Sequence, residues 1–228
     1  MLNSKYSKVL TVILIIAIIA IIGLLIFLGI DWYRATVTQA DADDFMNQFD
    51  DYVNNIGNTN TNTAVNNNTE LIEPNIDINN IVQNTQTGGS SDETGLTYKG
   101  YKVIGKIEIP ATDVEYPILE EATPGAIQVA IGKLYGVGVN EVGNMVLVGH
   151  NFRNGTFFSN NKNLELGDKI YITDLQGNRV TYTISNKYTT TTGDFDYAGR
   201  DTNGKREISL STCTDDTKNR LIIWAVEE

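Results

Sequence analysis

Residues 207–226 read Glu-Ile-Ser-Leu-Ser-Thr-Cys-Thr-Asp-Asp-Thr-Lys-Asn-Arg-Leu-Ile-Ile-Trp-Ala-Val, and this stretch decides the fold. Ile208 and Leu210 alternate with polar residues and with Cys213, which predicts a strand that carries the cysteine on the face opposite the aliphatic side chains. The polar run 214–219 is rich in turn-forming residues, and the run that follows it is rich in β-forming ones. We therefore predict a hairpin in which Arg220 opens the second strand close to Cys213.

The composition of the 228 residues limits the function. The formal net charge is −11, which argues against a nucleic-acid binder because such proteins concentrate positive charge. Cys213 is the only cysteine and His150 is the only histidine. A single cysteine excludes an internal disulfide and a multi-thiolate metal site, and a single histidine argues against a zinc site built on histidines.

The N-terminal segment has the pattern of a membrane anchor. The run from Val9 to Ile30 contains 22 residues without a charge, which is long enough to cross the hydrocarbon core of a bilayer. Trp32 and Tyr33 follow where interfacial aromatic residues are expected. A cleaved signal peptide is the alternative, but it would have a shorter apolar region followed by small residues. Residues 1–30 are thus predicted to be a cytoplasmic tip and an uncleaved transmembrane signal anchor, with the rest of the chain outside the cell.

Residues 31–95 are predicted to be a juxtamembrane segment and a low-complexity linker. Apolar residues up to Tyr52 are partly at helical spacing, which allows a short juxtamembrane helix. Between Asn54 and Thr94 the chain is rich in Asn, Thr, Gln, Gly and Ser, a composition too poor in apolar residues to form a core. We expect a flexible tether there.

Residues 96–228 are predicted to form an all-β domain. Alternation and turn signals indicate seven or eight short strands, which favours a closed β-barrel. Pro117 lies inside the strand 114–119 and predicts an edge position, while Pro124 is expected to open a short helix through Leu134. The other predicted strands outside the C-terminal hairpin are 103–109, 144–149, 169–174 and 179–187.

The residues of the hairpin and His150 could perform nucleophilic chemistry. A thiolate is favoured by a nearby imidazolium or guanidinium, and Arg220 could also donate hydrogen bonds to an oxyanion. The backbone N–H of Thr214 is a second candidate donor. Each residue also has an ordinary alternative: Cys213 as a small buried side chain, His150 as a structural strand end, and Arg220 on the surface or paired with Asp215 or Asp216.

The joint pattern resembles the sortase family. Residues 209–213, Ser-Leu-Ser-Thr-Cys, followed by Arg220 and an apolar strand, resemble the family's Thr-Leu-x-Thr-Cys signature and downstream arginine, with Ser209 in place of the usual threonine. Residues 144–151, Asn-Met-Val-Leu-Val-Gly-His-Asn, are similar to its strand ending in Gly-His. Phe157-Phe158 and residues 164–170 match a turn and a Leu-x-x-Gly-Asp entry into the next strand. The resemblance begins near Tyr101.

This resemblance implies an eight-stranded sortase-type β-barrel with short helices and a cysteine transpeptidase of the Gram-positive cell surface. Cys213 would attack the Thr–Gly carbonyl of an LPxTG-like sorting signal, His150 would protonate the leaving amine, and Arg220 would hold the substrate and stabilise the oxyanion. Thr212 and Thr214 are candidate substrate-binding or oxyanion residues. The implied partners are exported proteins with such signals, an amine of a peptidoglycan precursor or a pilin, and the membrane, with no nucleic acid.

The class within the family follows from what surrounds the core pattern. No apolar segment follows the last strand and no aromatic Asp-Pro lid motif occurs in the tether, so we expect a class A-like or D-like anchoring enzyme, with a pilin-polymerising sortase as the alternative. No cofactor is expected. Asp194, Asp196 and Asp201 lie in one loop as candidate calcium ligands, but we expect a solvated acidic loop there.

Two other classes of protein share parts of this pattern. An L,D-transpeptidase carries its histidine two residues before the cysteine, and a cell-wall cysteine peptidase places the cysteine before the histidine, so neither order fits. The non-enzymatic alternative is a tethered β-barrel binding module, in which Cys213 would be inert. Formation of an adduct between Cys213 and a sorting-signal peptide would separate the enzyme from the module.

Overall fold

The computed structural model describes residues 4–61 and 95–228. The chain divides into two compact units, Met1–Asp41 and Ala42–Glu228. The division falls within helix α1, which runs from Ser4 to Thr61. The tether expected from Asn54 therefore begins with helix as far as Thr61, and the rest of it lies outside the described residues.

The first unit carries the apolar part of α1. Its most apolar window has a mean hydropathy of 3.5, and none of that window is buried within the protein. A helix of this length and composition is compatible with the predicted membrane anchor.

The second unit is built mostly from strands, as predicted. β1 is a two-residue strand, and the three short helical turns η3, η4 and η5 are of the 3-10 type. In chain order the elements are β1 (Thr97–Tyr98), β2 (Tyr101–Ile109), η3 (Pro110–Thr112), β3 (Val114–Leu119), η4 (Ala126–Gln128), β4 (Ile131–Gly136), β5 (Gly143–Val148), η5 (Asn161–Asn163), β6 (Lys169–Asp174), β7 (Arg179–Thr191), β8 (Arg206–Cys213) and β9 (Asn219–Glu227).

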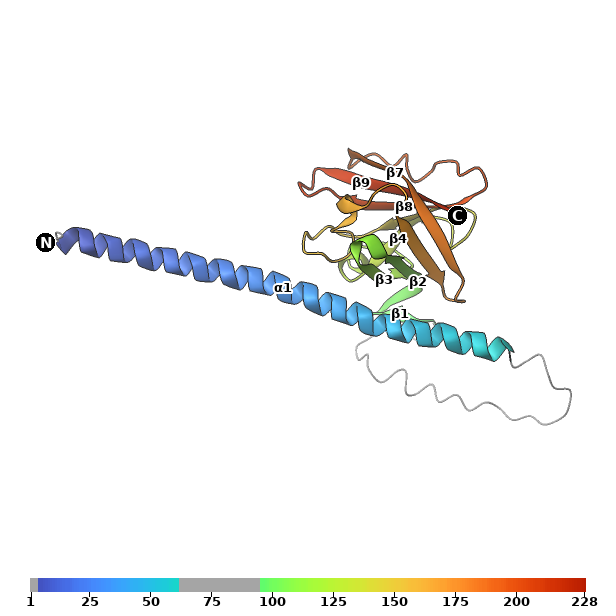
Figure 1. Ribbon diagram of the computed structural model, residues 1–228, viewed down its shortest axis with the longest axis horizontal. Helices are drawn as coiled ribbons and strands as arrows, with labels where there is room; N and C mark the ends of the chain where they lie inside the picture. The colour runs from blue at the N-terminus through green and yellow to red at the C-terminus, as the bar shows by residue number, and fades with distance from the viewer. Residues whose placement is uncertain (1–3, 62–94) are drawn as a thin grey trace, which may run out of the picture. The chain divides into compact units, whose positions relative to one another are not determined.

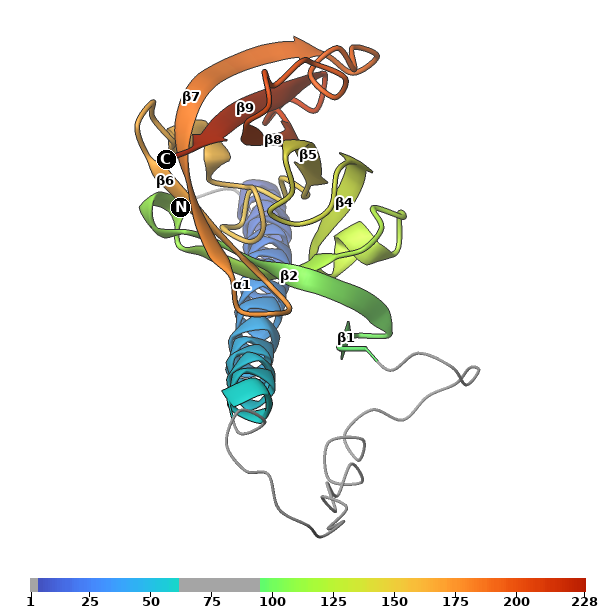
Figure 2. The same ribbon diagram turned by 90° about the vertical axis from the view of Figure 1, so that its right-hand side faces the viewer.

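Eight of these strands close into a barrel (Figure 1). The strand order is β1-β2-β3-β4-β5-β8-β9-β7-β6, and the additional pairing of β2 with β6 completes the ring. In Figure 2 the long strand β7 curves from β9 on one side of the barrel to β6, next to β2. The predicted closed barrel of eight strands is thus confirmed, with β1 as an addition outside the ring.

The barrel interior is filled by alternating side chains from the strands. Ile107, Leu147, Ile172, Leu210 and Ile223 are all at most 1% exposed and belong to one cluster. Each fully buried aliphatic side chain of this kind contributes about 1.5–3 kcal/mol relative to an exposed one. The period-2 pattern read from the sequence therefore corresponds to the inward faces of the strands.

Two local expectations differ from the structure. The helix expected from Pro124 to Leu134 is only the single turn η4, because β4 begins at Ile131 and pairs with β5. The strand expected at an edge, β3, lies between β2 and β4. It pairs with β4 only at Ile118 and Leu119, beyond Pro117, so the missing proline N–H interrupts no ladder on that side.

Part of α1 belongs to the barrel unit. Phe45, Met46 and Phe49 are at most 5% exposed and pack with Val103 and Leu119 of the barrel. The apolar positions recur at the three- and four-residue spacing of an amphipathic helix. The folded unit consequently includes a helical segment that the sequence placed outside the predicted domain.

Candidate active site

The register of β8 and β9 places two of the predicted site residues opposite each other. Cys213 is the last residue of β8, and Arg220 is its partner in the antiparallel ladder with β9. Directly opposite residues in such a ladder share a face of the sheet. Nη1 of Arg220 donates a hydrogen bond to Sγ of Cys213. Arg220 is therefore neither a free surface residue nor a partner of Asp215 or Asp216.

His150 reaches the same end of the sheet through a parallel pairing. β5 runs parallel to β8, with Val148 aligned to Ser211. His150 and Cys213 follow this last aligned pair by two residues each, so both lie at the same end of the sheet. The approach is fixed by hydrogen bonds, because the Thr212 hydroxyl donates to the Gly149 carbonyl at 2.8 Å and the Asn151 amide donates to the Cys213 carbonyl at 3.0 Å.

Gly149 lets the chain pass close to the core just before His150. A Cβ at this position would lie 2.6 Å from Cδ1 of Ile131 and 2.9 Å from the ring of Phe158. These distances are shorter than normal carbon contacts. The glycine before His150 thus has a packing reason, because a larger residue would have to displace the side chains of Ile131 and Phe158.

The three predicted residues lie on the outer face of the barrel. Leu210 points into the core cluster, so by alternation Ser209 and Cys213 face outward, as predicted. Cys213, Arg220 and His150 are all partly exposed. Cys213 is therefore not the fully buried side chain that the structural alternative would require.

Burial and a neighbouring positive charge favour the neutral form of His150. Burial lowers the pKa of His150 below its ordinary value, and the nearby guanidinium of Arg220 lowers it further. The ring of Phe152 stacks on the imidazole with a centroid distance of 4.7 Å. The imidazole is thus mainly neutral at neutral pH, and its ring plane is fixed by an aromatic neighbour.

Thr212 and Thr214, the other two predicted residues, have structural partners. Thr212 is 4% exposed, and its hydroxyl donates a hydrogen bond to the carbonyl of Gly149. The backbone N–H of Thr214 donates to the carbonyl of Asn219 at 3.1 Å and closes the hairpin. These contacts leave the Arg220 guanidinium as the donor best placed for an oxyanion.

Asp215 and Gln128 also contribute to the site, although no sequence motif indicated them. Asp215 accepts hydrogen bonds from Asn151 at 2.9 Å and from Lys162 at 2.7 Å, and both lower the pKa of its carboxyl group. Nε2 of Gln128 lies 2.9 Å from Nε2 of His150. These contacts join residues that are far apart in the sequence, so no motif or regular spacing indicates them.

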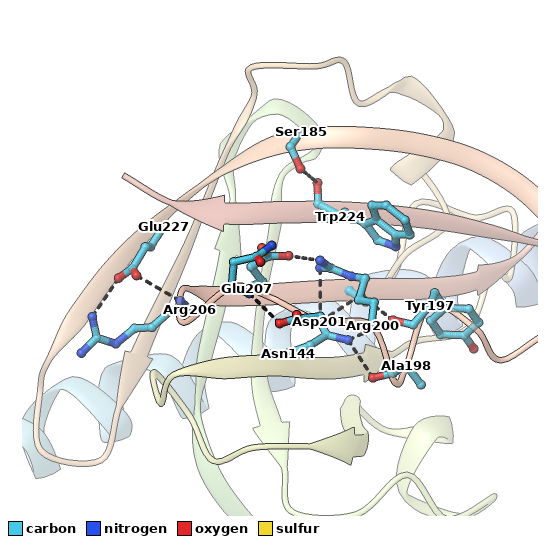
Figure 3. Close-up of polar contacts among 12 residues, drawn as sticks. Asn144, Ser185, Tyr197, Ala198, Arg200, Asp201, Arg206, Glu207, Trp224 and Glu227 are labelled. Atoms are coloured by element: carbon cyan, nitrogen blue, oxygen red, sulfur yellow. Dashed lines mark hydrogen bonds and ion pairs between the residues drawn. The ribbon is translucent and has the colours of Figure 1, made fainter.

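The loop between β7 and β8 is fastened over the outer face by a polar network (Figure 3). The buried amide of Asn144 donates to the carbonyl groups of Tyr197 and Ala198 at 2.9 and 3.1 Å. Arg200 forms an ion pair with Glu207, and its guanidinium lies 4.5 Å from the ring centroid of Trp224. The network holds the end of the loop against β5, β8 and β9.

The carboxylates of this loop make local hydrogen bonds. Asp194 accepts from the Thr190 hydroxyl and from the backbone of Asp196, which lowers its pKa. Asp201 accepts from the backbone N–H of Asn203 at 2.8 Å. Within residues 4–61 and 95–228, no three acidic, histidine or cysteine side chains are grouped to hold a metal ion. Asp194 and Asp201, two of the three candidate calcium ligands, thus accept hydrogen bonds from within their own loop.

Comparisons with known proteins agree with this geometry. The family model described as the Sortase domain matches residues 107–228. Sortase A of Bacillus anthracis is 32% identical over 130 residues, which are 54% of this chain and 58% of that protein. The chain therefore spans less than two thirds of the length of this relative.

Solved sortase structures share the fold. Sortase A from Corynebacterium diphtheriae matches with a TM-score of 0.51 and 28% identity, covering 56% of this chain and 61% of that one. A Clostridium perfringens sortase D5 transpeptidase matches with a TM-score of 0.51 and 28% identity, covering 56% of this chain and 79% of that one. Each similarity covers a little more than half of this chain.

Proposed function

This chain belongs to the sortase family, and from that premise we propose that it is a cysteine transpeptidase acting on an LPxTG-like sorting signal. It cleaves the signal between Thr and Gly and joins the acyl group to an amine of the cell wall. The observation that carries the proposal is the hydrogen bond from Arg220 to Sγ of Cys213, at the sheet end that His150 also reaches.

In the first half of the reaction, the thiolate of Cys213 attacks the Thr carbonyl carbon. The developing oxyanion accepts hydrogen bonds from Arg220, whose guanidinium has several N–H donors and can contact both sulfur and oxygen. His150, in its protonated form, gives a proton to the nitrogen of the leaving Gly as the peptide bond breaks. A thioester on Cys213 and a free amine result.

In the second half, an incoming amine attacks the thioester. His150, now neutral, accepts a proton from that amine, and a new amide forms as the carbon–sulfur bond breaks. The Cys213 thiolate and the protonated imidazole are restored. The lowered pKa of His150 makes the imidazolium a stronger acid in the first half, at the cost of a smaller protonated fraction at neutral pH.

The membrane and the cell wall supply the proposed context. The apolar part of α1 supports a single-pass anchor, and Lys5 and Lys8, which precede the apolar run, favour a cytoplasmic N-terminus with the barrel outside the cell. Exported proteins with sorting signals are the acyl donors in this proposal. The amine comes from a peptidoglycan precursor if the enzyme is class A-like or D-like, and from a pilin lysine if it polymerises pilins.

The test is an acyl-transfer assay with the full-length chain in detergent micelles. An LPxTG peptide is added with or without a Gly-based amine or a Lys-based amine, and intact mass is measured. We expect a thioester adduct on Cys213 without amine and an amide product with it, and the preferred amine distinguishes wall anchoring from pilin assembly. Peptide binding without adduct or cleavage would favour the non-catalytic binding module instead.

A further inference from the structure

The carboxamide of Gln128 contacts one nitrogen of the His150 ring. The two Nε2 atoms are 2.9 Å apart. A carboxamide nitrogen only donates, so Nε2 of His150 is the acceptor, and the neutral imidazole carries its proton on Nδ1. We propose that Gln128 is a positioning residue that holds Nε2 of His150 and leaves Nδ1 to exchange a proton with the substrate.

The surroundings of the ring make this contact decisive for its orientation. Phe152 stacks on the imidazole at an interplanar angle of 25°, which fixes the plane of the ring but allows it to be turned within that plane. Phe152 is itself held by Ser159, whose Oγ accepts its backbone N–H at 3.1 Å, and by the ring of Phe157. Gln128 supplies the remaining constraint, because its contact with Nε2 fixes the rotation of the imidazole within the plane of the ring.

The same carboxamide can serve both protonation states. With its nitrogen toward the ring it donates to the lone pair of a neutral His150, as observed. After half a turn of the amide, its oxygen accepts the Nε2–H of the imidazolium. During turnover the imidazolium gives its Nδ1–H to the leaving amine, and the neutral ring that remains carries its proton on Nε2, where the amide oxygen still accepts it. Nδ1 then has the lone pair that takes the proton of the incoming amine.

The backbone of Gln128 is fixed although its side chain is exposed. It is the last residue of η4, whose first residue, Ala126, is fully buried. The N–H of Ala126 donates to the Thr123 hydroxyl at 3.2 Å, and its carbonyl accepts from the N–H of Ala130 at 3.2 Å. Ala126 and Ala130 share a core cluster with Phe49 of α1. Packing therefore holds the turn that presents Gln128 to the imidazole.

The catalytic half of this inference rests on the proposed function, whereas the ring contact can be tested without it. His150 is the only histidine, so a tag-free, ¹⁵N-labelled full-length chain in micelles gives one set of imidazole signals. We expect the wild-type neutral ring to be protonated on Nδ1. In Q128L the Nε2–H form should increase, and in Q128E the pKa of His150 should rise because a carboxylate stabilises the imidazolium.

The kinetic expectation follows from the loss of one hydrogen bond. Q128L should lower kcat about five- to tenfold with KM unchanged. Q128E should recover most of this loss and move the pH profile upward. Q176L is the matched control, because Gln176 is exposed in the β6–β7 turn, and it should leave the ring signals and kcat unchanged.

The outcomes separate the two levels of the argument. A wild-type chain that forms no adduct on Cys213 would overturn the proposed function. An active wild type whose Q128L variant keeps both kcat and the Nδ1–H signature would overturn the role of Gln128 alone. Melting curves of Q128L and Q176L should agree, because both glutamines are exposed; a selective loss of stability in Q128L would assign Gln128 to folding instead.

Discussion

The hairpin that carries Cys213 and Arg220 and the loop that carries His150 are held in place by different interactions. In the hairpin, consecutive ladder pairs from Glu207–Val226 to Cys213–Arg220 fix the two residues through the backbone. His150 lies beyond the end of β5, where side chains from Gln128, Asn151 and Phe152 constrain it or the residues next to it. A ladder tolerates most side-chain changes, whereas a set of single contacts does not. Substitutions should therefore act locally in the hairpin and more diffusely around His150.

The largest effect is expected for C213A. Turnover should be abolished because the nucleophile is gone, while the melting temperature should change little because the β8–β9 ladder does not depend on the thiol. Acyl transfer and thermal unfolding measure the two quantities on one sample. A large fall in melting temperature would instead show that the sulfur has a packing role.

A smaller but still severe effect is expected for R220K. Lysine keeps the charge but cannot donate to sulfur and oxygen in the fixed geometry of a guanidinium, so kcat should fall about 10²–10³-fold. Arg179, an exposed arginine stacked on Tyr171, provides the control R179K, which should stay near the wild-type rate. Near-normal turnover in R220K would remove Arg220 from the mechanism.

An intermediate effect is expected for D215A, which removes the side-chain link between the hairpin turn and the His150 loop but leaves the hydrogen bond from Asn151 to the Cys213 carbonyl. Asn151 and Lys162 lose their shared acceptor, and we expect kcat to fall about tenfold, the scale of one charge-assisted hydrogen bond. Alkylation of Cys213 by iodoacetamide should keep its wild-type rate, because the hairpin is unaffected. Exposed Asp51 on α1 supplies the control D51A. Equal losses in turnover and alkylation would contradict the separation of the two regions.

The smallest effect is expected on the titration of His150. Its lowered pKa means that the unfolded chain binds more protons as the pH falls below about 6.5, so this residue makes stability decrease with acidification in that range. The variant H150Q should lack this component of the pH dependence. In R220Q the pKa of His150 should rise but stay below its ordinary value, because burial is the larger cause. Imidazole NMR shifts follow both changes, and an unchanged pKa in R220Q would contradict the coupling.

The same contrast explains what the sequence could predict. The hairpin could be predicted from the sequence, because the alternation of side chains and the turn-forming residues are local signals along the chain. The proximity of His150 to Cys213 depends on the parallel pairing of β5 with β8, which has no local signal and came from the family resemblance. The contacts of Gln128 and Asp215 depend on side chains meeting across loops, where neither periodicity nor spacing is informative.

The helical segment of the barrel unit had a readable helical pattern, but the sequence indicated no partner for it. Phe45 and Phe49 stood at helical spacing, yet their acidic neighbours and the polar run after them favoured a segment outside the domain. One of those acids has a definite role, because Asp50 accepts a hydrogen bond at 2.8 Å from Lys106, whose side chain is 7% exposed. The partner of an amphipathic helix is a long-range feature that periodicity alone does not identify.

This segment also determines how the barrel can be handled as a separate polypeptide. A fragment cut at Leu96 would uncover the surfaces of Val103, Leu119 and Ala130 that Phe45, Met46 and Phe49 shield. Apolar patches that become exposed to solvent in this way promote self-association. A recombinant fragment intended to stay monodisperse should therefore start no later than Ala42.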